Sequence, residues 1–125
     1  MEIINVNNEL REFYGSEQWY RHPATKLLYT DGVQYLAEKY ECYWLIDSIL
    51  SYNIGPNAIS LTEDFQKWEL TRIIDNEEET NRFCLTCDDG RGNILVTQAI
   101  PLSDFEGDKV TLYFTNDTLL LPSEN

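Results

Sequence analysis

The fold is predicted mainly from residues 30–52, TDGVQYLAEKYECYWLIDSILSY, the longest continuous stretch with a helical period of apolar residues. Asp31 and Gln34 have the spacing of a capping box, which predicts a helix with Asp31 as its N-cap. Two apolar stripes follow at helical spacing, the first formed by Val33, Leu36, Ala37 and Tyr40 and the second by Cys42, Leu45, Ile46 and Ile49. Because the stripes are slightly out of phase, we expect a kink or break near residues 40–42.

The second half of this segment is apolar on nearly every side, since only Asp47 and Ser48 are polar between residues 42 and 50. Such a helix is buried on several sides or forms half of an interface. We therefore expect a central core helix. The alternative is a surface for self-association through Tyr43 and Trp44, which would suit a homodimer.

The remaining chain divides into a helical part and a β part. Upstream, we expect a short helix that starts at Asn8 and ends at Gly15, followed by a loop over residues 16–30. Beyond the break at Gly55 and Pro56, the apolar period changes from helix to strand. Strands are predicted over residues 65–74, 82–88, 94–100 and 110–114, with a short edge segment at 118–121.

Taken together, these patterns predict a single α+β domain spanning residues 1–125. Its helices, over residues 8–53, would pack on one face of a four-stranded antiparallel meander sheet over residues 64–121. In the first strand, alternation places Trp68, Leu70 and Ile74 on the core face.

The net charge of −13 is the most informative number in the composition. Residues 1–62 carry eight acidic and four basic side chains, whereas residues 63–125 carry fourteen and five. This balance argues against direct binding of a nucleic-acid backbone or an anionic membrane, because both need clustered Lys and Arg. It allows a basic protein partner, including one whose basic groove holds nucleic acid. The alternative is that the acidity serves only solubility.

The expected compartment is the cytoplasm. The three cysteines cannot all pair internally, and the N-terminal residues MEIINVNNEL show neither a basic region nor an apolar run typical of a signal peptide. No stretch approaches the ~20 apolar residues that a membrane-spanning helix needs.

A resemblance to a known family is carried by six segments: ELREFYGSEQWYRHP, LLYTDGVQYLAEKYECYWLIDSI, FQKWEL, CDDGRGN, TLYF and LLLPSE. They resemble those of a family of small, uncharacterised bacterial proteins described as a domain of unknown function. The resemblance covers most of the chain. It implies a bacterial stand-alone domain of the kind also carried by phages, plasmids and other mobile elements. Because the family has no assigned activity, it implies no catalytic residues.

Motifs for catalysis, metals or cofactors are weak. Cys84 and Cys87 have CxxC spacing, but on a strand residues three apart face opposite sides, so their sulfurs would diverge. The glycines at 90 and 92 occupy positions where a calcium loop needs oxygen ligands. His22 is the only histidine. We therefore expect no metal, no cofactor and no catalytic residues.

Two sets of residues are candidates for binding a partner. The first is Trp19, Tyr20, Arg21 and His22, which place two aromatic rings and two potential cations together in a predicted loop. The alternative is that the rings close the end of the helical core while Arg21 caps a helix or pairs with an acid. The second set lies in acidic bends and comprises Glu77, Glu78, Glu79, Asp88 and Asp89.

The sequence thus favours a small acidic, non-enzymatic interaction protein that engages a basic protein partner. An inhibitor of a nucleic-acid-binding machine is the most specific version of this hypothesis. The alternative is a small-molecule-binding or regulatory module with a pocket lined by Trp, Tyr and Arg21. An enzyme that uses Asp31, His22 or nearby carboxylates is a third interpretation.

Overall fold

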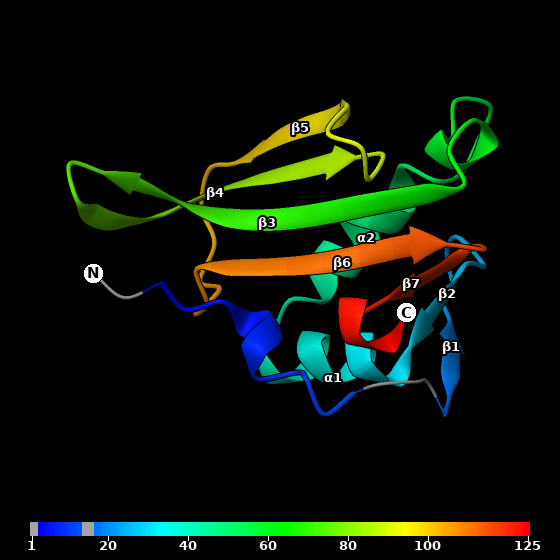
Figure 1. Cartoon of the computed structure of the whole chain (residues 1–125), viewed down its shortest axis with the longest axis horizontal. Helices are drawn as coiled ribbons and strands as arrows, with labels where there is room; N and C mark the ends of the chain where they lie inside the picture. The colour runs from blue at the N-terminus through cyan, green and yellow to red at the C-terminus, as the bar shows by residue number, and fades with distance from the viewer. Residues whose placement is uncertain (1–2, 14–16) are drawn as a thin grey trace.

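Seven strands form one mixed sheet in the order β1-β2-β7-β6-β3-β4-β5 (Figure 1). The computed structural model describes residues 3–13 and 17–125. Neighbouring strands are antiparallel except β2 and β7, which run parallel. The strands are β1 (Trp19–Arg21), β2 (Leu28–Thr30), β3 (Phe65–Asp75), β4 (Glu78–Asp88), β5 (Ile94–Ile100), β6 (Lys109–Thr115) and β7 (Thr118–Leu120).

Two α-helices and three short 3-10 helices accompany the sheet in the described part of the chain. They are η1 (Val6–Asn8), α1 (Asp31–Lys39), α2 (Tyr43–Ser51), η2 (Ile59–Leu61) and η3 (Pro122–Glu124). Within residues 3–13 and 17–125, no helix is both long enough and apolar enough to cross a membrane.

The predicted four-stranded antiparallel meander covered by N-terminal helices is wrong, although the broad α+β class is retained. Residues 16–30, expected to be loop, supply β1 and β2. β6 does not continue the meander beside β5 but returns to the other edge of β3, and β7 then joins β6 to β2. Strands β1, β2 and β7 have three residues each, too few to show an alternating pattern in the sequence.

The long helical segment divides into α1 and α2, so the predicted break near residues 40–42 is confirmed. Glu41, between the two helices, has a φ of 53°. The predicted N-cap is wrong by one residue, because the hydroxyl of Thr30 accepts the hydrogen bond from the N–H of Val33 at 3.2 Å. The short helix predicted from Asn8 does not form in the described residues, because η1 ends at Asn8 and residues 9–12 form turns; the predicted stop at Gly15 lies outside the described residues.

The hydrophobic core lies between the two helices and one face of the sheet. α1 contributes Val33, Leu36 and Ala37, α2 contributes Leu45, Ile46, Ile49 and Leu50, and the sheet contributes alternate residues of β3, β4 and β6, including Trp68, Leu70, Phe83, Leu85, Leu112 and Phe114. Ile74 is exposed rather than buried, because the pairing of β3 with β4 shifts register between Arg72 and Ile74. Because Leu45, Ile46, Ile49 and Leu50 are all buried in this core, α2 is the core helix that its composition predicts.

An ion pair between Arg72 of β3 and Asp108, the residue before β6, is buried at one end of this core. The Arg72 Nε donates to Asp108 Oδ1 at 2.8 Å, and the two side chains are only 8% and 4% exposed. The other guanidinium nitrogens donate to the carbonyls of Thr80, Phe105 and Gly107. A buried charge is tolerated only when it is paired and hydrogen-bonded in this way.

The N-terminal segment is attached to the same ion pair. The N–H of Ile4 donates to Asp108 Oδ2 at 2.8 Å. Farther along, the side-chain amide of Asn7 bonds both the N–H and the C=O of Thr111, at 2.6 and 2.9 Å. Asn7 thereby replaces a neighbouring strand along the part of β6 that β7 does not reach, since β7 pairs with β6 only over Tyr113–Thr115.

Replacing Arg72 with Ala is expected to lower the free energy of unfolding by about 3–5 kcal/mol, because Asp108 would stay buried without its cation. Arg82→Ala is a matched control, since Arg82 pairs with Asp75 on the surface, where the side chains are 49% and 62% exposed. Its loss should be at most about 1 kcal/mol. Urea unfolding monitored by tryptophan fluorescence measures both values, and equal losses would contradict the buried ion pair.

Candidate functional site

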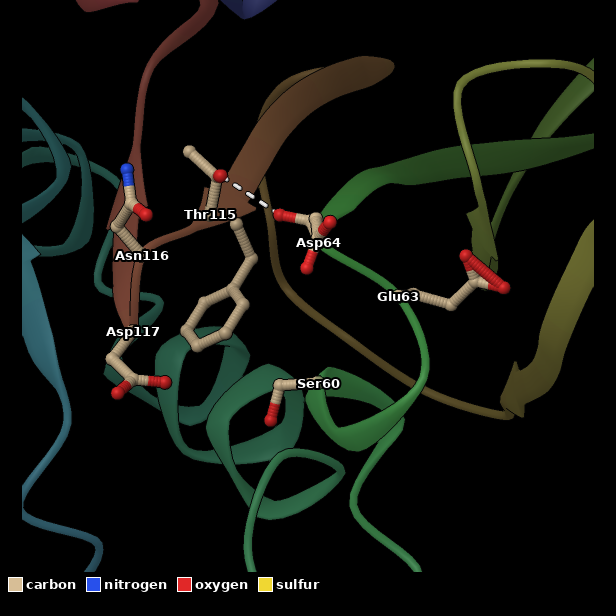
Figure 2. Close-up of a pocket in the computed structure, with 7 residues that line it drawn as sticks. Ser60, Glu63, Asp64, Thr115, Asn116 and Asp117 are labelled. Atoms are coloured by element: carbon tan, nitrogen blue, oxygen red, sulfur yellow. Dashed lines mark hydrogen bonds between the residues drawn. The ribbon is translucent and has the colours of Figure 1, made fainter.

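A pocket of about 490 Å³ opens at the end of the sheet where β3 begins and β6 ends (Figure 2). The antiparallel register creates this juxtaposition, because Phe65 at the start of β3 lies opposite Thr115 at the end of β6. The lining residues are Ser60, Glu63, Asp64, Phe114, Thr115, Asn116 and Asp117. We call these seven residues the acidic pocket.

One wall of the acidic pocket is a tight turn. Asn116 and Asp117 connect β6 to β7, and their φ angles are 51° and 57°. Asn and Asp are among the few residues other than glycine that adopt two consecutive positive φ angles, as a type I′ hairpin requires. The carbonyl of Asp117 accepts a hydrogen bond from the N–H of Leu28 at 3.0 Å, which ties this wall to β2.

The opposite wall is formed by the segment between η2 and β3. Ser60 belongs to η2, and Glu63 and Asp64 follow it. The hydroxyl of Thr115 donates to the backbone carbonyl of Asp64 at 2.8 Å, the contact drawn as a dashed line in Figure 2. This bond joins the Thr115 side chain on one wall to the backbone of the other and leaves the Asp64 carboxylate outside the contact.

The acidic pocket carries three carboxylates, from Glu63, Asp64 and Asp117, and no basic side chain among its lining residues. Within the part of the chain that the structure describes, none of these carboxylates accepts a hydrogen bond or enters an ion pair. The same part contains no group of three or more His, Cys, Asp or Glu side chains arranged to hold a metal ion. Carboxylates that line one hollow without a basic neighbour favour a cationic ligand such as a guanidinium or an ammonium group.

The negative charge continues into the loop between β4 and β5. Burial and the nearby carboxylates of Asp88, Glu63 and Asp89 raise the pKa of the Cys87 thiol to about 12. These carboxylates therefore act on one buried group at the same end of the sheet. We call Glu63, Asp64, Asp88, Asp89 and Asp117 the acidic end.

Asp89 has a structural role in that loop as well as a charge. Its carboxylate accepts hydrogen bonds from the Asn93 side chain and from the backbone N–H groups of Arg91 and Asn93, at 2.7, 2.8 and 3.2 Å. These bonds, the one from the Asn93 side chain foremost, lower the pKa of Asp89. Asp88 and Asp89, two of the predicted acidic residues, act on Cys87 together with Glu63 and therefore lie beside the acidic pocket.

The other predicted acidic residues, Glu77, Glu78 and Glu79, lie at the opposite end of the sheet. They form the hairpin tip where β3 ends and β4 begins, and all three are exposed. Figure 1 shows this tip projecting away from the rest of the fold. Because each of the two strands is 11 residues long, the tip is separated from the acidic end by about 35 Å. The structure does not bring the two predicted acidic groups together.

The predicted set of Trp19, Tyr20, Arg21 and His22 is likewise divided. Tyr20 stacks on Tyr29 with ring centroids 5.6 Å apart, and Arg21 donates to the carbonyl of Lys26 at 2.8 Å. Arg21 therefore holds a turn rather than capping a helix.

His22 is buried and connects two elements. Its Nδ1 accepts from the N–H of Thr25 at 3.1 Å, so its Nε2 carries the proton that is donated to Asp47 of α2 at 2.7 Å. The ring has both nitrogens engaged and anchors the β1–β2 hairpin to α2.

Trp19 is the one member of that set with a largely exposed side chain beside a hollow. It lines a second hollow of about 280 Å³ together with Thr30, Thr115, Asn116, Thr118, Leu120, Glu124 and Asn125. Thr115 and Asn116 line both hollows, so the turn between β6 and β7 separates them. Trp19 consequently offers an aromatic surface next to the acidic pocket.

Sequence reasoning did not select Asn116, Asp117 or Ser60 as site residues. One signal was available for the turn, because Asn-Asp between two apolar alternations is typical of a type I′ hairpin. Nothing in the sequence placed that turn beside Glu63 and Asp64, because the two lie more than 50 positions apart along the chain.

Comparison with known families gives one match. Residues 4–125 match the family of unknown function DUF6876. The chain belongs to this family. The resemblance to an uncharacterised family that the sequence suggested is thereby confirmed in its coarse form, since DUF6876 carries no assigned activity. No curated protein and no solved structure matches the chain.

The cysteines of this DUF6876 protein provide a test of the strand register beside the site. Iodoacetamide at about pH 8 is expected to modify only Cys84 in the folded protein, since Cys84 is half-buried while Cys42 and Cys87 are buried. Burial is the main cause that raises the pKa of both buried thiols to about 12. Mass spectrometry before and after unfolding in urea gives the counts, with all three cysteines reactive when unfolded. Modification of Cys87 as fast as Cys84 in the folded state would contradict the register of β4.

Proposed function

We propose that this protein is a small, acidic, non-enzymatic interaction protein that binds a basic protein partner at its acidic end. The observation that supports this most is the acidic pocket, which Glu63, Asp64 and Asp117 line without a counter-charge among the lining residues. Carboxylates that line one hollow make the potential there negative, and this potential attracts a cation from a partner. The ligand that enters the pocket is an Arg or Lys side chain of the partner.

The pocket's other lining groups suit a long basic side chain. Ser60, Thr115 and Asn116 offer oxygen atoms that accept hydrogen bonds from the charged head of Lys or Arg. Arg satisfies this set best, because its planar guanidinium carries five donors and binds carboxylates in pairs. Trp19, in the neighbouring hollow, provides a surface on which a second basic residue stacks.

The biological setting of the proposal is a bacterial cytoplasm, with the gene on the chromosome or on a mobile element. In its most specific form the protein inhibits a nucleic-acid-binding machine. The acidic end presents five carboxylates at one end of the sheet, and a basic groove that binds phosphates attracts such a surface. The negative charge of the acidic end is what supports the proposal that the protein is an inhibitor.

A small cationic molecule is the alternative occupant. The volume of about 490 Å³ lies within the range of small-molecule sites, and a polyamine matches the three carboxylates. The small-molecule pocket predicted from the sequence was lined by Trp, Tyr and Arg21. Arg21 lines neither the acidic pocket nor the second hollow, so the alternative proposed here places the ligand in the acidic pocket instead.

Neutralising the acidic pocket is expected to weaken binding of a nine-residue arginine peptide by about tenfold, because three favourable charge contacts are lost. The variant combines Glu63→Gln, Asp64→Asn and Asp117→Asn, and Asn at 117 still allows the positive φ of the turn. Isothermal titration calorimetry measures the dissociation constant at about 50 and about 200 mM salt, with weaker binding expected at the higher concentration.

The matched control combines Glu77→Gln, Glu78→Gln and Glu79→Gln, which removes the same charge from the opposite end of the sheet. This variant should bind the peptide within about twofold of the unmodified protein, since these carboxylates lie beyond a Debye length from the pocket. Equal weakening by both variants would show that only net charge matters and would end the proposal. Tighter binding of spermine than of the peptide would favour the small-molecule alternative.

A further inference from the structure

The two edges of the sheet differ in length and chemistry. β1 forms one edge with three residues, Trp19–Arg21, and includes a charged side chain. β5 forms the other edge with seven residues, ILVTQAI, none of which is charged. Among the described residues no strand lies beyond β5 (Figure 1), so its outer backbone N–H and C=O groups have no ladder partner. Such an edge is a template for another strand.

β5 has few of the features that normally protect an edge strand. Proteins block free edges with inward-pointing charges, lysines, prolines, bulges or short strands. The irregularity in the pairing of β4 with β5 affects only the beginning of β5, between Cys87 and Asp88 of the partner strand, and Pro101 follows after the last residue. Val96–Ile100 therefore remain a regular, neutral edge.

Exposed apolar side chains surround this edge. Ile94 is 60% exposed within β5, and Leu102, two residues after the strand, is 77% exposed. Leu95 and Leu61 line a groove of about 380 Å³ beside the beginning of the strand, together with Pro56, Asn57, Ala58, Ile59, Thr62 and Glu63. Covering these side chains would add apolar burial to the backbone hydrogen bonds of a paired strand.

We infer that β5 is a dimerisation edge, on which the β5 strand of a second copy of this chain pairs in antiparallel orientation. A strand edge is complementary to itself under a two-fold axis, because each copy presents the same alternation of donors and acceptors. An axis near Thr97, the central residue of β5, brings Ile94 of one copy towards Ile100 of the other. The two sheets join into one continuous sheet.

The charge distribution favours β5 as the place where two copies of this chain meet. Two chains of net charge −13 repel each other over most of their surface, and a neutral strand is where they approach at the lowest electrostatic cost. Antiparallel pairing also places the two acidic ends at opposite ends of the dimer, because each lies beside the start of its own β5. Both acidic pockets thus stay open, and the inference does not rest on the proposed function.

The test is sedimentation velocity over a range of protein concentrations, comparing the unmodified chain with Thr97→Lys. Two lysines would then face each other near the axis, and the dimer dissociation constant should rise by about tenfold. Thr71→Lys is the matched control: Thr71 is also exposed on a strand, but on β3 in the interior of the sheet. It makes the same change in net charge and should leave the dissociation constant within about twofold.

Two further measurements complete the test. Salt should strengthen the dimer, because it screens the repulsion between two acidic chains. Hydrogen exchange of the β5 amides should slow as the protein concentration rises. A chain that stays monomeric at every concentration and salt would overturn the inference. So would a dimer that Thr97→Lys leaves intact, since the contact would then lie elsewhere, for example at Tyr43 and Trp44.

Discussion

The buried ion pair between Arg72 and Asp108 is the interaction on which the position of the acidic pocket depends. It joins β3 to the start of β6 through side chains, and a backbone hydrogen bond from Arg72 N–H to the Asp108 carbonyl at 2.8 Å adds to it. Together these contacts fix the register of the two strands. A shift by one residue would turn Leu112 and Phe114 out of the core and would leave two buried charges unpaired. With the register fixed at one end, Thr115 must meet the start of β3 at the other end, where the pocket opens.

This register also divides the acidic residues of the chain into two groups with different surroundings. The hairpin tip with Glu77, Glu78 and Glu79 is exposed, and solvent and salt screen its charges. At the acidic end Asp64 and Asp117 are exposed as well, but Glu63, Asp88 and Asp89 are half-buried and their field reaches a buried thiol. A carboxylate beside a low-dielectric core interacts more strongly with a cation than one on an open tip. The physical contrast between the two ends is therefore larger than their similar charges suggest.

Sequence patterns predicted those parts of the fold that depend on neighbouring residues. The break between α1 and α2, the burial of α2, and the long strands β3, β4 and β5 all follow from local periodicity. The pairing of β6 with β3, and of β7 with β2, depends on contacts between distant segments, which periodicity does not encode. Arg72 illustrates the limit. It alternates onto the same face as Trp68 and Leu70, but its charge suggests exposure to solvent. Its burial depends on Asp108, which lies 36 positions later in the sequence. The acidic pocket was missed for the same reason, because its two walls come from distant segments.

The most direct test of the account is a nuclear magnetic resonance titration of the isotope-labelled protein with the nine-residue arginine peptide. Backbone amides of residues 60–64, 88–93 and 114–117 are expected to shift progressively and saturate together, because they surround one binding site. Amides of residues 75–79, which carry comparable charge at the other end of the sheet, should stay almost unchanged. Shifts of equal size at both ends, or strongest at residues 75–79, would contradict the claim that the fold concentrates binding at the acidic end.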